Sequence, residues 1–491
     1  MTAVSAPTFP NLIGGAFAPP QGGWLDVANP ARASEIVARV AATTAVEIDR
    51  AIEAAATGFE VWRRVSPGAR GAVLAGAASW LREHAEEVAS LVSAEMGKTL
   101  PEARAETARS ADFFDYYGSL SRLPEGDRLA DGRPGVEAHV RVEPVGMVVA
   151  ITPWNDPLLT PARKLAPALF AGNAVLIKPA TETPVSSLLL ARALHEAGLP
   201  PGVLNTVTGR AADVISPLCE DKRVDAVTFT GSTEVGLDLQ RRLAGRNVRL
   251  QTEMGGKNPS VVLADADLDL AAATIAAAAF GQAGQRCTAT SRVIVADEVV
   301  RPLLDRLVAK AGGIVVGPGD DEATTMGPLV SERQLRSVLG DVERALEQGA
   351  ERVFGEGRLQ QTPLDQGWFV SPVILAAVTR DMDIWNQEVF GPVLAVSTVS
   401  SLAEAIDAAN DSPYGLAAAL FTDSVDASTR FIDSVEAGQV AVNLPTSGWD
   451  VHMPFGGWKL SGSGFKEQGL EGLRFYTRVK TVAVKATAPG G

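Results

Sequence analysis

The sequence has few cysteines, few histidines and no long apolar run, and each shortage argues against a class of protein. Only Cys219 and Cys287 occur in 491 residues, which does not fit a secreted protein held by paired disulfides. The four histidines show no metal-ligand spacing with each other or with a cysteine, so we expect no metal. The most apolar stretches, such as residues 145–151 and 270–280, are far shorter than a membrane span. Residues 1–10 have no basic segment followed by an apolar run, so we expect no signal peptide and a cytoplasmic location.

Positive charge is also scarce. The chain carries 44 Lys and Arg against 58 Asp and Glu, a formal net charge of -14 with a pI of about 5.0. Such a surface repels polyanions, so we expect neither nucleic acid nor an anionic membrane as a partner. A small anionic substrate is still allowed, because a pocket can be locally basic. At 46% hydrophobic residues the chain has enough apolar mass for two large lobes.

Helical and β-rich segments alternate along most of the chain. Alternation of this kind predicts parallel sheets with right-handed crossovers, and it occurs in two successive sets. In the first set, helical spacing covers residues 47–60, 69–95, 101–120, 161–169, 185–197 and 211–219, and β-rich runs cover 145–151, 174–178, 204–207 and 226–229. In the second set, β-rich runs cover residues 260–263, 293–296, 393–399 and 440–443, and helices cover 268–280, 299–311 and 401–410. Residues 123–142 and 475–486 fit neither set and resemble strands that reach outward to another subunit.

Two residues stand out for their chemistry. Cys287 follows a glycine-rich stretch, Gly-Gln-Ala-Gly-Gln-Arg, at the end of an alanine-rich helix, and Arg286 adjoins it. A neighbouring cation lowers a thiol pKa, so Cys287 is a candidate nucleophile, although a buried inert cysteine explains the pattern about equally well. Cys219 lies in an ordinary helix end, and we interpret it as structural. Glu253 precedes Gly-Gly, which marks a tight bend, but a solvent-exposed glutamate is the commoner explanation.

Three further segments follow β-rich runs. Residues 229–236 place small residues at the start of a helix, an arrangement that favours phosphate, although the strict three-glycine dinucleotide pattern is absent. Residues 151–157 form an irregular loop containing Asn155, and Lys178 ends another β-rich run. Ligands of open α/β sheets bind at the carboxyl ends of the strands. These segments therefore predict a binding site at that edge.

Taken together and in this order, these motifs resemble the aldehyde dehydrogenase superfamily almost from end to end. In its motifs the chain is similar to the semialdehyde dehydrogenase branches, such as those for succinic and α-ketoglutaric semialdehyde. The motifs that carry the resemblance are residues 152–155, Lys178-Pro, 229–236, 253–257, 284–287, Glu388-Val-Phe-Gly-Pro and Pro454-Phe-Gly-Gly.

The resemblance implies a mechanism and a set of site residues. Cys287 would attack the aldehyde to form a thiohemiacetal and then a thioester, Asn155 would complete the oxyanion hole, and Glu253 would activate the hydrolytic water. Lys178 belongs to the implied catalytic set and would also bind the adenosine ribose. The residues implied to hold the cofactor are Ile151, Thr152, Trp154, Lys178, Thr181, Gly231, Ser232, Val235, Glu388 and Phe390.

The resemblance also implies the aldehyde dehydrogenase fold, an α/β architecture with a Rossmann-like cofactor lobe, an α/β catalytic lobe and a small β oligomerisation element. We expect residues 1–121 and 144–252 to form the NAD(P)-binding domain and residues 253–460 the catalytic domain. Residues 122–143 and 470–487 would form the oligomerisation element. Strand pairing through that element predicts a homodimer or homotetramer.

Departures from the family pattern bear on the cofactor and the substrate. NAD-preferring members carry Glu three residues after the lysine, whereas this chain has Thr181 there and Glu182 one place later, which favours NADP or dual use. Arg163 and Arg286 match arginines of branches that act on acidic aldehydes, and guanidinium groups suit carboxylates. Each arginine could instead be structural. Asp156, which replaces a common aromatic residue, would work against an anionic substrate.

Other functions remain open on the sequence alone. An uncharged aromatic or aliphatic aldehyde is the rival substrate, with Trp449, Phe455 and Trp458 near the expected tunnel mouth. A thiol esterase would use the same cysteine, glutamate and asparagine without a cofactor. Acyl transfer to coenzyme A is disfavoured because that branch typically lacks the general base that Glu253 provides.

Overall fold

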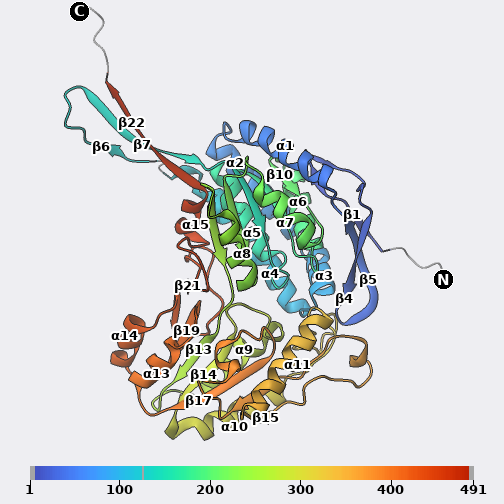
Figure 1. Ribbon diagram of the computed structural model, residues 1–491, viewed down its shortest axis with the longest axis vertical. Coiled ribbons are helices and arrows are strands. Elements are labelled where there is room, and N and C mark those ends of the chain that lie inside the picture. The colour runs from blue at the N-terminus through green and yellow to red at the C-terminus, as the bar shows by residue number, and fades with distance from the viewer. Residues whose placement is uncertain (1–5, 124–125, 486–491) are drawn as a thin grey trace, which may run out of the picture.

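The computed structural model describes residues 6–123 and 126–485, and these form two α/β lobes and a projecting arm (Figure 1). The first lobe contains the N-terminal half of the chain, and the second begins at β13 (Asn258–Val262). The helix α15 (Gly469–Phe475) returns to the first lobe, where Phe475 joins its core. Within the described residues, no helix is both long enough and apolar enough to cross a membrane.

The first lobe is built on a five-stranded parallel sheet within the described residues. Its strand order is β10 (Leu204–Thr206), β9 (Ala174–Lys178), β8 (Met147–Ile151), β11 (Ala226–Thr230) and β12 (Arg249–Glu253). Successive residues of a strand point to opposite faces, and both faces are buried here. Val148 and Ala150 pack into one core and Val149 and Ile151 into the other, which explains the uninterrupted apolar run.

Helices cover both faces of this sheet. One core contains apolar side chains of α2 (Pro67–Glu83), α3 (Ala85–Met96), α4 (Leu100–Ser119), α5 (Leu159–Ala171) and α6 (Val185–Glu196). The other contains side chains of α1 (Ala45–Trp62), α7 (Ala211–Glu220) and α8 (Thr233–Leu243). Two hydrophobic layers around one parallel sheet are the arrangement that the alternating pattern predicts.

The second lobe has a larger sheet, of seven strands within the described residues. Its order is β15 (Glu351–Phe354), β16 (Val373–Ala376), β17 (Val393–Val399), β14 (Thr290–Ala296), β13 (Asn258–Val262), β19 (Ala417–Phe421) and β20 (Gln439–Val442). All neighbours are parallel except the edge pair β15–β16. The packed helices are α9 (Leu268–Phe280), α10 (Val300–Gly312), α11 (Glu332–Glu347), α13 (Leu402–Asn410) and α14 (Val425–Ser434).

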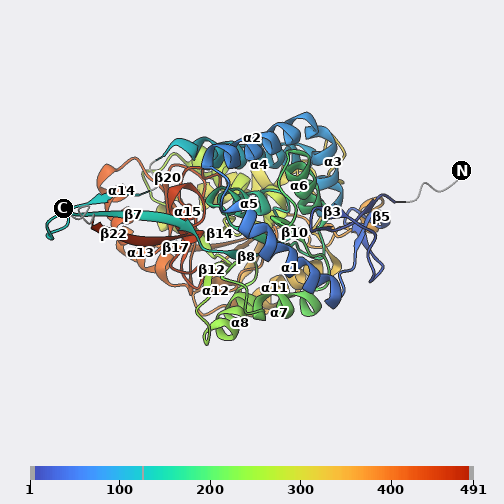
Figure 2. The same ribbon diagram turned by 90° about the horizontal axis from the view of Figure 1, so that it is seen from above.

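The two segments that fit neither lobe meet in the arm. β7 (Val136–Pro144) pairs antiparallel with β22 (Thr477–Lys485) along its whole length, and β6 (Arg128–Leu129) lies on its other side. Figures 1 and 2 both show this ribbon extending away from the lobes. The prediction that both segments form strands is confirmed. Residues 124–125 and 486–487 of the predicted oligomerisation element lie outside the described residues. Residues 1–5 of the predicted NAD(P)-binding domain also lie outside them.

Some elements differ from the sequence prediction. The single helix predicted over residues 69–95 is wrong, because the chain breaks at His84 into α2 and α3. The His84 ring stacks on Trp80 at 4.1 Å between centroids, and its Nδ1 lies 2.9 Å from the Trp80 carbonyl oxygen, so it is half-buried. The sequence also gave no indication of β4 (Trp24–Asn29), β5 (Arg32–Ala41) or α11, whose patterns are mixed.

Candidate active site

The predicted site residues meet at the carboxyl edge of the first sheet. Ile151 ends β8 beside Lys178, which ends β9, and Thr230 ends β11 beside Glu253, which ends β12. Phe229 pairs with Ile151 across the middle of the sheet. The parallel register therefore brings residues that are up to a hundred positions apart in the sequence to one rim, where an open α/β sheet binds its ligands.

Cys287 reaches this rim from the second lobe on a tightly turned loop. Gln282, Ala283 and Gly284, which follow α9, all adopt left-handed backbone conformations with φ of 55°, 54° and 67°. A side chain at Gly284 would place its Cβ 2.1 Å from the Gly391 carbonyl oxygen, so the glycine is required by close approach as well as by φ. The loop leaves Cys287 partly accessible, whereas Cys219 is fully buried.

The environments of the two thiols differ in the charges around them. Burial raises the pKa of Cys219 to about 12, which fits its interpretation as an inert core residue. Burial also raises the pKa of Cys287, and the charges of Asp156, Glu388 and Glu253 raise it further. Arg163 is the cation that lowers it. Arg286, the sequence neighbour of Cys287, donates from its Nε to Gln282 Oε1 at 2.7 Å, on the same loop.

Glu253 is buried without a compensating hydrogen bond to its carboxyl group in the described part of the chain. Its side chain is buried, and neither carboxyl oxygen has a hydrogen-bond partner among the described residues. Burial raises its pKa well above the ordinary value, and the charge of Glu467 adds to the effect. A Cβ at Gly456 would lie 2.4 Å from Glu253 Oε1, so the glycine makes room for the carboxyl group. A glutamate whose pKa is raised in this way is a stronger base than an exposed one once it is ionised.

A buried ion cluster beside Glu253 was not foreseen from the sequence. Lys164 Nζ donates to Glu467 Oε1 and, at 2.8 Å, to Thr228 Oγ1. Arg163 Nη1 lies 3.4 Å from Glu467 Oε2. Burial raises the pKa of Glu467, but the charges of Lys164 and Arg163 outweigh it and the net shift is downward. An acid within Ser-Gly-Phe-Lys-Glu-Gln-Gly, a stretch as glycine-rich as the one at Glu253, was the available signal.

Arg163 occupies a distinctive place between this cluster and the thiol. It is buried, its guanidinium lies 4.5 Å from the centroid of the Phe455 ring, and its Nε has no hydrogen-bond partner within the described part of the chain. Phe455, predicted near the tunnel mouth, thus packs against the predicted substrate arginine. Trp458 is half-exposed on the short strand β21 (Trp458–Lys459).

Several residues predicted to bind the cofactor lie at the carboxyl edge of the first sheet and present polar groups or aromatic rings there. Lys178 is buried, and burial lowers the pKa of its ammonium group to about 8. The Thr152 hydroxyl oxygen has no partner among the described residues. Glu388 accepts a hydrogen bond from Gly256 N at 2.9 Å, and burial raises the pKa of its carboxyl group to about 7. Phe390, with φ of 54°, meets Trp154 edge to face at 5.1 Å.

Comparison with known proteins identifies the family. The family model described as "Aldehyde dehydrogenase family" matches residues 17–482. The chain belongs to the aldehyde dehydrogenase family. It is 40% identical to α-ketoglutaric semialdehyde dehydrogenase of Bacillus subtilis (strain 168) over 97% of this chain and 98% of that protein. It is 43% identical to α-ketoglutarate semialdehyde dehydrogenase of Haloferax volcanii over 93% and 95%.

Solved structures agree with this assignment. A betaine aldehyde dehydrogenase from Staphylococcus aureus, in complex with NAD+, superimposes with a TM-score of 0.94 at 32% identity and covers 97% of this chain and 94% of that one. The predicted family, fold and oxidoreductase class are therefore confirmed for this member of the aldehyde dehydrogenase family.

The residues predicted to lie near the adenosine end of the cofactor make polar contacts within the protein. Thr181 Oγ1 donates to the Gly209 carbonyl oxygen at 3.1 Å, and Glu182 forms an ion pair of 3.1 Å with Arg333 on α11. Ser232 caps α8, with its hydroxyl 3.5 Å from Val235 N, directly after Gly231. The N-terminus of α8 thus lies at the rim where the sequence predicted a phosphate.

Proposed function

We propose that this protein oxidises the semialdehyde of a dicarboxylic acid to the diacid, with NAD or NADP as hydride acceptor. The observation that carries the choice of substrate is Arg163, a buried guanidinium with an unpartnered Nε in the described structure, whose charge acts on Cys287. The names of the two relatives above, both of which concern the semialdehyde of α-ketoglutarate, support the same substrate class.

The chemistry divides between the two lobes. The Cys287 thiolate adds to the aldehyde carbon, and the carbonyl oxygen becomes an oxyanion that Asn155 and the Cys287 backbone N–H stabilise. A nicotinamide held beside Trp154 and Phe390 would supply the hydride acceptor for oxidation of this adduct to a thioester. Glu253 then takes a proton from water as the water oxygen attacks the thioester carbon. The carbon–sulfur bond breaks, and the carboxylic acid and the thiol are released.

A count of charges favours Arg163 over Arg286 as the contact for the substrate carboxylate. Arg163 and Lys164 are two cations that form ion pairs with a single carboxylate, Glu467. This leaves one net positive charge for an anion to neutralise. Arg286, in contrast, acts on Asp156 within a group of charges that also contains Lys98 and Glu106 and sums to zero.

The residues at the rim fit a dinucleotide, and we propose that both NAD and NADP are used. Lys178 and the Thr152 hydroxyl are polar groups available to a ribose, and Trp154 and Phe390 offer faces to a nicotinamide. The related betaine aldehyde dehydrogenase binds NAD+, which supports NAD. Thr181 places no carboxylate where a 2′-phosphate would lie, and Glu182 is paired with Arg333, which supports NADP as well.

The arm supports our prediction of a homodimer or homotetramer. Val142, Val479 and Val484 lie on its strands and are exposed at 39%, 69% and 55%. Apolar side chains on an exposed three-stranded arm are best buried by the same arm of a second copy. The cytoplasmic location stays a prediction from the cysteine content.

The test is steady-state reduction of NAD and NADP with succinic semialdehyde, α-ketoglutaric semialdehyde and benzaldehyde. For Arg163→Met we expect KM for the two acids to rise by about 10- to 100-fold, the equivalent of one charge-assisted hydrogen bond, with benzaldehyde changed less than about threefold. Arg104→Met, which removes an exposed arginine on α4, is the control. Equal losses with acids and benzaldehyde would contradict the assignment of Arg163, and no turnover with any aldehyde would contradict the function.

A further inference from the structure

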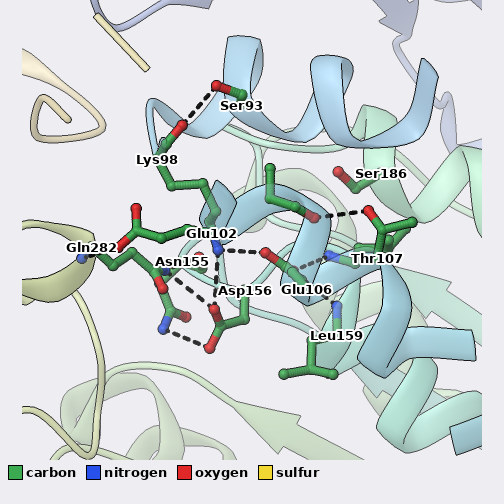
Figure 3. Close-up of polar contacts among 12 residues, drawn as sticks. Ser93, Lys98, Glu102, Glu106, Thr107, Asn155, Asp156, Leu159, Ser186 and Gln282 are labelled. Carbon is green, nitrogen blue, oxygen red and sulfur yellow. Dashed lines mark hydrogen bonds and ion pairs between the residues drawn. The ribbon is translucent and has the colours of Figure 1, made fainter. Parts of the chain in front are cut away.

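A polar network at the contact between the lobes lies behind Asn155 (Figure 3). We call it the Asp156 cluster; it consists of Lys98, Glu106, Asp156, Gln282 and Arg286. The first three belong to the first lobe and the last two to the loop that carries Cys287. The mechanism above uses none of these five side chains.

The first-lobe half of the cluster is an ion triplet. Lys98, whose side chain is 1% exposed, pairs with Glu106 and, at 3.1 Å, with Asp156. Glu106 also accepts the backbone N–H groups of Leu158 and Leu159 at 2.9 Å, at the start of α5. The lysine is therefore held from one side by a carboxylate fixed to a helix end, and Figure 3 shows its ammonium group between the two acids. Asp156 is the only one of the three that is partly exposed, at 20% of its side chain.

The second-lobe half connects to Asp156 through one amide. Gln282 Nε2 donates to the Asn155 carbonyl oxygen and, at 3.2 Å, to Asp156 Oδ1. Gln282 Oε1 accepts from Arg286 Nε at 2.7 Å. This one side chain therefore ties the backbone of the oxyanion residue to the residue that precedes the nucleophile.

Gln282 is also part of the left-handed turn that ends α9. A non-glycine residue in this conformation is strained and persists only where surrounding contacts hold it. Here the backbone N–H of Gln282 donates to Glu102 Oε1 at 2.6 Å, and its side chain makes the contacts described above. The contacts of Gln282 with the first lobe thus stabilise the left-handed turn, and the turn fixes the position of the loop that carries Cys287.

Asp156 contacts the Asn155 side chain as well. Asn155 Nδ2 lies 3.5 Å from Asp156 Oδ2, at the limit of a hydrogen bond. An ionised carboxylate can only accept, so it favours the amide orientation in which NH2 rather than the carbonyl oxygen lies on its side. The charges of Lys98, Arg286 and Arg163 together lower the pKa of Asp156 despite its burial, and Glu106 is the acid that faces it.

We propose that Asp156 is a positioning residue: held by Lys98, it fixes the Asn155 amide and, through Gln282, the position of the Cys287 loop relative to that amide. The inference rests on the proposed roles of Cys287 and Asn155. Under this inference Asp156 acts in the oxyanion site through Asn155, and Arg286 holds the Gln282 side chain in place by a hydrogen bond.

Two variants separate the effect of the Asp156 charge from the effect of the hydrogen bonds that Gln282 makes to both lobes. Asp156→Asn keeps the shape but removes the charge and the obligatory acceptor. Gln282→Met removes the bridge and leaves every charge in place. Asp112→Asn, an exposed aspartate of α4 that pairs with Arg82, is the matched control. The measurements are kcat and KM for aldehyde, cofactor affinity from tryptophan fluorescence, and the rate of Cys287 alkylation by iodoacetamide as a function of pH.

We expect both variants to lower kcat about tenfold, less than the 10²–10³ of a lost oxyanion donor, while cofactor affinity changes less than about twofold. Because the Asp156 charge raises the thiol pKa, the alkylation profile of Asp156→Asn should move to lower pH, and that of Gln282→Met should not. Wild-type kcat in folded Asp156→Asn, or an unmoved alkylation profile, would overturn the inference. If Asp156→Asn does not fold, wild-type kcat in Gln282→Met overturns it. An inactive wild-type protein with a reactive thiol would instead contradict the proposed function.

Discussion

Replacing Glu253 with glutamine separates the two halves of the proposed reaction. The substitution is nearly isosteric, and neither carboxyl oxygen of Glu253 has a hydrogen bond to lose within the described structure. Thioester formation uses Cys287 and Asn155 and should continue in the variant. Hydrolysis of the thioester should slow, because glutamine cannot take a proton from water.

The size of the effect follows from the role of a general base. Such a group contributes about 10²–10⁴-fold, so kcat should fall by that factor. The raised pKa of Glu253 adds a pH dependence with a definite sign. The carboxyl group acts as a base only after it loses its proton, so wild-type hydrolysis should accelerate as pH rises towards that pKa, and hydrolysis in the variant should lack this contribution.

Stopped-flow measurement of NAD(P)H absorbance tests both points. Glu253→Gln mixed with cofactor and semialdehyde should produce a burst of about one reduced cofactor per active site, followed by slow turnover. The melting temperature should not fall. A buried acid whose pKa is raised on folding destabilises the folded state increasingly as pH rises above the pKa of the unfolded chain, and glutamine has no such titration. Loss of the burst together with turnover would refute the division of roles. Unchanged kcat would show that Glu253 is not the base.

Three further changes test the loop, the cofactor pocket and the arm. Gly284→Ala places a Cβ against the Gly391 carbonyl oxygen and a side chain at positive φ. We therefore expect the free energy of unfolding in urea to fall by about 1–3 kcal/mol and alkylation of Cys287 to slow. A variant as stable as the wild type would contradict the close approach. The Lys178 ammonium group, whose pKa is about 8, loses its charge above that pH. KM for NADP should then rise more steeply with pH than KM for NAD. A ratio of the two KM values that stays constant with pH would place Lys178 away from the 2′-phosphate. Val479→Asp with Val484→Asp should reduce the mass measured by light scattering, whereas an unchanged mass would exclude the arm as the subunit contact.

Much of the first lobe follows from local pattern. Its strands β8, β9 and β11 are buried on both faces, so they appear in the sequence as short apolar runs, whereas the edge strand β12, which ends at Glu253, does not. The parallel register then places the ends of these strands together without further information. The helix break at His84 was not predictable in the same way, since it depends on a ring contact with Trp80 and lacks a proline or glycine.

The polar interior of the site could not be predicted from local pattern. Lys164 and Glu467 are separated by 303 positions, and Lys98 and Asp156 by 58, so only the folded chain shows that they are paired. Sequence proximity was misleading for Arg286, which adjoins Cys287 along the chain but directs its guanidinium to Gln282. Charge in a buried site depends on which groups the fold brings together, and spacing in the sequence carries little of that information.

The charges around Cys287 also explain why an acid beside the oxyanion residue is compatible with an anionic substrate. From the sequence, Asp156 argued against such a substrate because it adds a negative charge close to Asn155. In the structure Lys98 balances it, and Arg286 and Arg163 lower its pKa, so its charge is largely compensated within the protein. Arg163 and Lys164 form their ion pairs with a different carboxylate, Glu467. In our proposal the acid that holds Asn155 and the arginine that meets the substrate carboxylate therefore belong to different ion-pair groups, so an acid at position 156 does not cancel the charge offered to the substrate.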